Sequence, residues 1–269
     1  MIAEMYKRRV TTSYILLGLV ACVIVGYAYV EPPKTTADWG EFAVFLIPVV
    51  MLVTIVVLNK KHYNKTVSVD IPNSARLIFD LDHFVMKKDV AFFPRLLCFE
   101  KDGNYVGSLE PINIPWYVYP FGFFYSSLVV HFPLTYAFID NQENTLFTFK
   151  QKGFKTTVLT IYNEHDQKIG IYKQEEFKSL LNIKGELFDE NNEFLLPITV
   201  SGASGNFSLN CEEEQWAYFY NGRFPHEYTK IFRDVDNDIV EVSDTLSKEN
   251  KVRLLAVIGF LFIARIRNN

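Results

Sequence analysis

The stretch "VRLLAVIGFLFIARI", residues 252–266, decides the fold, because it carries no charge between Leu254 and Ala264. Eleven uncharged residues form about 16 Å of helix, which is half of the roughly 30 Å hydrocarbon core of a bilayer. A helix that is apolar on every face and too short to span must be buried within protein. We therefore predict a buried central helix over about residues 245–264.

A third membrane span is the alternative for this stretch. Arg253 and Arg265 flank the apolar run, and long basic side chains that reach toward the headgroups can lengthen a span. In the buried interpretation, the side chain of Asp244 or Ser247 caps the beginning of the helix. The two interpretations differ in where the preceding strands must lie, so the structure distinguishes them.

Two other apolar stretches, residues 13–30 and 42–58, are long enough to cross a bilayer as helices of about 26 Å each. The polar segment "EPPKTTADWGE" between them predicts a short exposed turn. Residues 1–65 therefore read as a transmembrane helical hairpin. A cleaved signal peptide is the alternative for the first stretch, but a second apolar stretch follows almost immediately.

Basic residues predict the orientation of this hairpin. Only Lys34 lies in the connecting segment, whereas six basic residues flank the outer ends of the spans: Lys7, Arg8, Arg9, Lys60, Lys61 and Lys65. By the positive-inside rule, both ends of the hairpin are cytoplasmic. We expect a multi-pass protein of the cell membrane with its C-terminal domain, residues 66–269, in the cytoplasm.

That domain reads as a series of β-hairpins. Short β-rich runs alternate with turn clusters, as in "RLLCFEKDGNYVGSLE", where Asp102 and Gly103 tolerate a positive φ between two strands. One uncharged, aromatic stretch, residues 114–140, could be mistaken for a membrane helix. Because Pro120 and Pro133 interrupt it, we predict buried strands and a connecting loop there.

Several segments resemble a known family when they are taken in order: "FTFKQKGFKTTVLTIYNEHDQKIG", "FKSLLNIKGELFDENNEFL", "SGASGNF", "YNGRFPHEYTKIFRDVDNDIVEVSD" and the C-terminal apolar helix. The family is the bacterial tubby C-terminal-like domain, which is related to LURP-one-related and phospholipid-scramblase barrels. The resemblance implies a mainly β fold, a closed antiparallel tubby-like β-barrel of about twelve strands around a hydrophobic C-terminal helix. Closure would remove exposed strand edges.

The sequence contains no pattern that predicts catalysis. "DVDND", residues 234–238, begins like a calcium loop but lacks its Gly and its final Glu, and residues 201–207 lack the ending of a phosphate loop. The three cysteines and five histidines have no metal-ligand spacing. We therefore expect a non-enzymatic protein with no catalytic residue, no metal and no cofactor.

The charge distribution points away from nucleic acid. Residues 66–269 carry 20 Lys and Arg against 27 Asp and Glu, while residues 1–65 carry 7 against 4. An acidic domain has no bulk attraction for a nucleic acid backbone. We expect membrane lipids as partners, and a membrane-associated protein partner remains open.

One basic cluster is a candidate lipid-binding surface. Lys150, Lys152 and Lys155 surround Gly153, and Lys168 and Lys173 follow one hairpin later. The family resemblance implies that exterior basic residues bind phosphorylated lipid headgroups; near an anionic leaflet each contributes about 1 kcal/mol. Scattered surface lysines are the opposing interpretation. The expected function is a membrane protein whose cytoplasmic barrel docks lipid headgroups or a protein partner, and lipid movement of the scramblase kind is the alternative.

Overall fold

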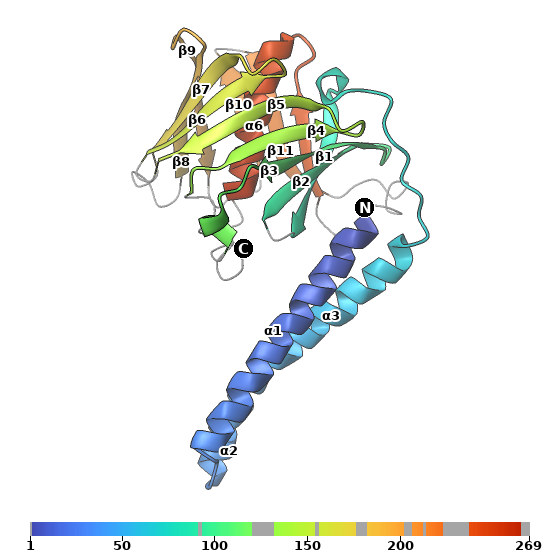
Figure 1. Cartoon of the computed structure of the whole chain (residues 1–269), viewed down its shortest axis with the longest axis vertical. Coiled ribbons are helices and arrows are strands. Elements are labelled where there is room, and N and C mark those ends of the chain that lie inside the picture. Colours follow the sequence, from blue (N-terminus) through green and yellow to red (C-terminus); the bar gives the residue numbers. More distant parts are fainter. Residues whose placement is uncertain are drawn as a thin grey trace. The chain divides into compact units, whose positions relative to one another are not determined.

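The structure is a computed structural model, and it describes residues 2–90, 93–119, 132–153, 156–175, 182–201, 206–211, 214–222 and 237–264. The chain divides into two compact units, Met1–Asp70 and Ile71–Asn269. The first is helical and the second is built mainly of β-strands (Figure 1). Several expectations fall wholly or partly outside the described residues, namely those for Lys155, Arg265, residues 120–131, 202–205 and 234–236.

The helical unit is a hairpin of two long helices. α1 (Ile2–Val30) packs along α3 (Leu46–Thr66), and the short α2 (Thr36–Val44) lies between them in the chain. The expected turn is therefore shorter than its eleven residues, because Thr35 and Asp38 form a reciprocal capping box that begins α2 at Thr36.

Apolar side chains cover the outside of this hairpin. Ile2–Val30 and Thr36–Thr66 are each long and apolar enough to cross a membrane, and only 6% of the most apolar window of each is buried. Val25 and Val50, which belong to these two segments, are examples of exposed apolar side chains. Side chains of this kind on every face of a helix are stable in lipid and costly in water.

The second unit is a nearly closed barrel of twelve antiparallel strands, in the order β10-β11-β12-β1-β2-β3-β4-β5-β6-β7-β8-β9. The strands are β1 (His83–Val90), β2 (Pro94–Glu100), β3 (Tyr105–Ile112), β4 (Thr135–Asp140), β5 (Thr145–Lys152), β6 (Thr156–Asn163), β7 (Lys168–Glu175), β8 (Asn182–Asp189), β9 (Phe194–Ser201), β10 (Phe207–Cys211), β11 (Glu214–Gly222) and β12 (Asn237–Val242). Short 3-10 turns, η1 (Ile78–Asp80) and η2 (Trp116–Val118), precede β1 and follow β3.

Two features nearly close the barrel. β12 pairs with β1 from His83↔Glu241 to Met86↔Asp238, which joins the last strand of the chain to the first. The edge strands β9 and β10 also approach each other, and the thiol of Cys211 donates to the carbonyl of Leu195 at 3.5 Å. The predicted antiparallel barrel is confirmed as a nearly closed one.

The same five-residue turn recurs at one end of the barrel. It begins at Glu100, Asp140, Asn163 and Asp189, and each of these residues accepts a bond from the backbone N–H three residues later. That later residue has a positive φ in every case: Gly103, Glu143, Asp166 and Asn192. Side-chain oxygens of Asp140, Asn163 and Asp189 accept further backbone N–H bonds, which explains why acidic and amide residues mark these turns in the sequence.

Helix α6 (Lys248–Ala264) occupies the centre of the barrel (Figure 1). Every residue from Val252 to Ile263 is buried, and Phe260 and Phe262 lie 6.2 Å and 4.4 Å, centroid to centroid, from Tyr172 and Phe219 of the wall. The prediction of a buried central helix is confirmed. The helix begins at Lys248 rather than near residue 245, because Ser247 is the residue whose hydroxyl caps it, accepting from the N–H of Asn250 at 3.2 Å.

The aromatic stretch of residues 114–140 has two environments among its described residues. Tyr136 and Phe138 of β4 are fully buried, as expected, and stack on Phe149 and Phe147 of β5. Trp116 and Tyr117 are exposed instead. They belong to η2, between β3 and β4, and therefore correspond to the predicted connecting loop rather than to a buried strand.

Candidate functional site

The lysines predicted as a lipid-binding surface lie mostly on the outside of the barrel wall. Side chains alternate along β5, so that Phe149 and Gln151 are buried while Lys150 and Lys152 are exposed. The same alternation on β7 buries Tyr172 and exposes Lys173. Two-residue periodicity therefore places these lysines on one face. We call Lys150, Lys152, Lys168 and Lys173 the lysine wall.

Strand register brings the lysine wall together. Lys152 is paired with Val158 of β6, and Val158 is paired in turn with Lys173 of β7. Neighbouring strands are about 4.8 Å apart, so these two lysines start from backbone positions roughly 10 Å apart. Lys150 lies two residues before Lys152 on the same face. The structure thus gathers residues that are separated by about twenty positions in the sequence.

Aromatic rings hold two of these ammonium groups on the wall. The Nζ atom of Lys150 lies 4.5 Å from the ring centroid of Tyr162, and that of Lys173 lies 4.6 Å from the ring centroid of Phe188. Exposed cation–π contacts contribute about 0.5–1 kcal/mol each. They limit the motion of the side chains and leave the charge accessible to an anion.

A third member of the lysine wall, Lys168, makes a hydrogen bond instead of a ring contact. Nζ of Lys168 donates to the backbone carbonyl of Glu190 at 3.2 Å, and its side chain is half-buried. Carboxylates also lie on this face: Glu186 is the cross-strand partner of Lys173, and Glu175 is the partner of Lys184. The positive charge of the wall is therefore concentrated toward Lys150 and Lys152 on β5.

The basic residues that flank the two apolar stretches lie on α1 and α3. Lys7 is exposed and lies 3.9 Å from Glu4, while Arg8 and Arg9 are half-buried. Lys60, Lys61 and Lys65 are exposed in the last turns of α3. Their positions fit the flanks of a hairpin, and the side of the membrane on which they lie stays a prediction.

A cavity of about 330 Å³ opens on another part of the barrel. Its lining includes the imidazole of His83, whose Nδ1 lies 3.2 Å from Asp82 and whose Nε2 lies 3.4 Å from Glu241. Burial is the largest single influence on Asp82 and opposes its ionisation, but the side-chain hydrogen bond with His83, backbone hydrogen bonds and the charge of His83 together outweigh it and lower the pKa of this carboxyl. The other lining residues are Gln215, Ala217, Tyr218, Val242, Ser243 and Asp244.

This acidic pocket lies across the barrel from the lysine wall. It belongs to β1, β11 and β12, whereas the wall belongs to β5 and β7. The centres of the two groups are six strands apart in a ring of twelve. The barrel therefore presents opposite charge on opposite sides, a feature that net composition conceals.

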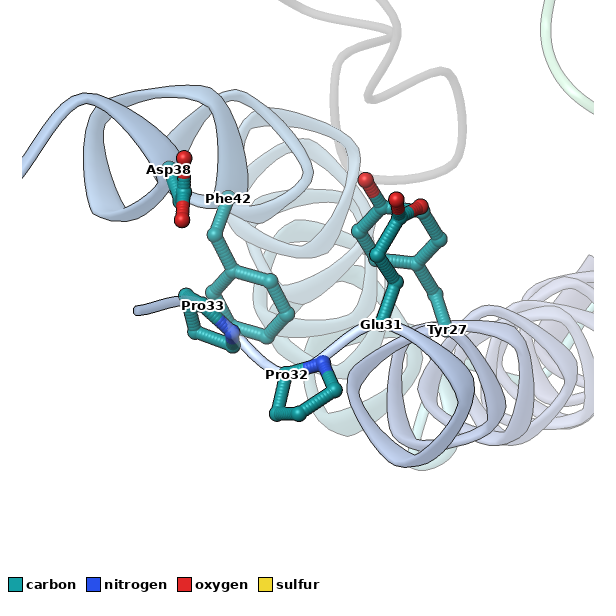
Figure 2. Close-up of a pocket in the computed structure, with 6 residues that line it drawn as sticks. All are labelled: Tyr27, Glu31, Pro32, Pro33, Asp38 and Phe42. Atoms are coloured by element: carbon teal, nitrogen blue, oxygen red, sulfur yellow. The ribbon is translucent and has the colours of Figure 1, made fainter. Parts of the chain in front are cut away.

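A smaller cavity, of about 130 Å³, lies at the tip of the helical hairpin, between the end of α1 and α2. Figure 2 shows its lining residues, Tyr27, Glu31, Pro32, Pro33, Asp38 and Phe42. The carboxylate of Asp38 already accepts the backbone N–H groups of Lys34 and Thr35 at 2.9 Å. This cavity is accounted for by the capping of α2.

Two parts of the site were missed by sequence reasoning. Tyr162 and Phe188 gave no signal, because the contacts that place them under lysines depend on strand register. Alternation of apolar or neutral residues with lysines near the ends of β5 and β7 was a readable signal for which lysines share a face. Among the described residues, no group of three or more His, Cys, Asp or Glu side chains could hold a metal ion.

Comparisons with protein-family models, with curated proteins and with solved structures give no match for this chain.

Proposed function

We propose that this protein is a membrane-anchored binding protein whose barrel docks on anionic lipid headgroups through the lysine wall. One observation carries the proposal: three exposed lysines, Lys150, Lys152 and Lys173, share one face of a barrel that is joined to an apolar helical hairpin. Exposed lysines beside an anionic leaflet contribute about 1 kcal/mol each.

The length of the connection supports this proposal. Residues 67–70 lie between the end of α3 and Ile71, where the second unit begins. Four extended residues reach at most about 14 Å. A bilayer that holds the hairpin therefore keeps the barrel at a high effective concentration near its surface, so that individually weak headgroup contacts are sufficient for docking.

The test is chemical protection of lysines in the full chain reconstituted into lipid nanodiscs. An amine-reactive reagent followed by mass spectrometry should show Lys150 and Lys152 protected in discs that contain phosphatidylserine, compared with discs of phosphatidylcholine alone. Added salt should remove the protection, because exposed charges are screened within about 8 Å at physiological ionic strength. Lys101, which is exposed in the turn between β2 and β3, is the internal control.

A variant sharpens this test. Replacing Lys150 and Lys173 by Gln should remove most of the protection at Lys152, whereas replacing Lys101 by Gln should leave it unchanged. Equal reactivity of Lys150 and Lys152 in both kinds of disc would contradict lipid docking.

The acidic pocket favours a second candidate function, docking of a basic segment of a protein partner. Asp82, Glu241 and Asp244 surround a single histidine there, and Tyr218 adds an aromatic face. An anionic leaflet would repel this side of the barrel and leave it directed toward solution. Replacing Glu241 by Gln should weaken capture of a Lys- and Arg-rich peptide without changing lysine protection in nanodiscs.

A further inference from the structure

We infer that the turn after β3, with the exposed rings of Trp116, Tyr117 and Tyr119, enters the headgroup region of a bilayer beside the lysine wall. We call residues 116–119 the aromatic turn. This inference rests on the membrane docking proposed above and adds a second, uncharged contact to it. The occupant that we assign to the turn is the polar–apolar interface of a lipid bilayer.

The aromatic turn has one buried residue and three outward ones. Val118 is fully buried in the barrel core, and its backbone N–H bonds to the carbonyl of Pro115 at 3.0 Å. Trp116 is 84% exposed, and Tyr117 and Tyr119 are both about half exposed. The turn is thus anchored by one side chain while large rings face solvent.

Strand register places this turn at the same end of the barrel as the strongest positive charge. Ile112, the last residue of β3, is paired with Thr135 of β4, and Thr135 is paired with Lys150 of β5. The aromatic turn begins four residues after Ile112, and Lys152 lies two residues beyond Lys150. Two strand spacings, roughly 10 Å, separate the end of β3 from the end of β5.

Charge and ring chemistry favour a bilayer interface over a protein surface as the occupant. Residues 111–139 contain no Asp, Glu, Lys or Arg, so no carboxylate in this segment opposes approach to an anionic leaflet. Trp and Tyr combine an apolar body with a polar N–H or O–H, which suits the depth of the headgroups. Lysines beside such rings complete a membrane footprint, because their charges reach phosphates while the rings enter below them.

The experiment measures the depth of Trp116 in the full chain. Trp39, Trp116 and Trp216 are the three tryptophans, and Trp216 is buried in the barrel core. Trp39→Phe leaves Trp116 as the exposed emitter, and the Trp39→Phe/Trp116→Phe pair gives the signal of Trp216 alone. Both proteins are placed in phosphatidylserine-containing nanodiscs whose acyl chains carry bromine near the headgroup.

We expect brominated lipid to quench most of the Trp116 emission, defined as the difference between the two proteins, and to leave Trp216 unquenched. Water-soluble acrylamide should quench Trp116 less in discs than in detergent. Trp116→Ser should lower the protection of Lys150, whereas Phe194→Ser, which removes an exposed ring from the start of β9, should not change it.

Three other outcomes would overturn the inference, and the state of Lys150 shows whether the proposed function fails with it. If Trp116 is open to acrylamide and unquenched by bromine while Lys150 stays protected, the lysine wall docks without the aromatic turn. If Trp116 is shielded from both quenchers, protein covers it. If neither Trp116 quenching nor lysine protection appears, the inference and the proposed docking are both wrong.

Discussion

The guanidinium of Arg253 lies 2.6 Å from the carboxylate of Glu190, so that the central helix is joined by charge to the turn between β8 and β9. The same side chain donates through Nε to the carbonyl of Ile169 at 2.7 Å. Arg253 is only 5% exposed, whereas half of the Glu190 side chain reaches solvent. In the alternative interpretation of the sequence, Arg253 would flank a membrane span. In the structure it is buried and connects the central helix to the strands of the barrel.

Replacing Arg253 by Met should destabilise the barrel by about 1.5–3 kcal/mol, the usual value for hydrogen bonds to a charged group. The Met side chain keeps most of the apolar stem but leaves the carbonyl of Ile169 without this donor. Glu190→Gln is the matched control and should cost less than about 1 kcal/mol, because the Gln side-chain oxygen can still accept from Arg253 and this position is partly solvated. Denaturant unfolding in detergent, followed by Trp216 emission, gives both values. Equal losses would show that the link to Ile169 contributes little.

Phe260→Ala should cost about 3–5 kcal/mol through lost contacts and the cavity left behind. Phe260 is 1% exposed and lies against Tyr172 in the centre of the barrel. Phe194→Ala removes the same ring from a position that is 55% exposed and should change stability by less than about 0.5 kcal/mol. Protease resistance of the barrel at increasing denaturant should separate the two variants. A small effect at Phe260 would mean that the helix does not fill the barrel tightly.

Gly259→Ala should destabilise the protein by about 1–2 kcal/mol, even though Ala favours a helix over Gly by about 1 kcal/mol. A Cβ atom built at residue 259 would lie 2.3 Å from Cδ2 of Leu109 on β3, so this leucine must move. Leu109→Ala makes the space, and the double variant should lose less stability than the sum of the two single variants. Gly26→Ala on α1 has nothing within 4 Å and serves as the neutral control. Strict additivity at residues 259 and 109 would argue against the close approach.

The ion pair between Lys248 and Glu164 should contribute stability at neutral pH that disappears in acid. Nζ of Lys248 lies 2.9 Å from Glu164, and this hydrogen bond lowers the pKa of the carboxyl below its ordinary value of 4.5. A depressed folded-state pKa stabilises the protein above pH 4.5 and loses that contribution as the pH falls through the folded value. Because both groups are well exposed, the difference between Lys248→Gln and the parent should be below about 1 kcal/mol at pH 7. Thermal unfolding at pH 7 and pH 3 should show the difference only at pH 7.

The orientation of the hairpin is tested by labelling cysteines from outside intact cells. In a variant in which Cys22 and Cys211 are replaced by Ser, a membrane-impermeant maleimide should label Thr36→Cys and fail to label Asn191→Cys. Both positions are exposed, one at the start of α2 and the other in the turn after β8. Asn191→Cys should react once the membrane is opened with detergent. Labelling at residue 191 in intact cells would reverse the expected topology.

Local chemistry determined much of this structure. Uninterrupted apolar runs predicted α1, α3 and α6, because helix length and hydropathy depend only on neighbouring residues. Turn clusters in the sequence predicted a series of hairpins, and at Asp140, Asn163 and Asp189 the side chains of such clusters bond the backbone two to four residues away. Alternation along β5 was sufficient to predict that Lys150 and Lys152 share one face.

Only the tertiary structure decided how these pieces meet. The pairing of His83 with Glu241 joins positions about 160 residues apart, and nothing local to β1 or β12 specifies that partner. The rings beneath Lys150 and Lys173 come from strand register, and burial of Arg253 follows from the carbonyl of Ile169 and the carboxylate of Glu190. Exposure of Trp116 likewise depends on where β3 ends. Hydropathy and turn chemistry depend on neighbouring residues. The contacts between distant strands, and those of Arg253, depend instead on the summed twist and register of twelve strands.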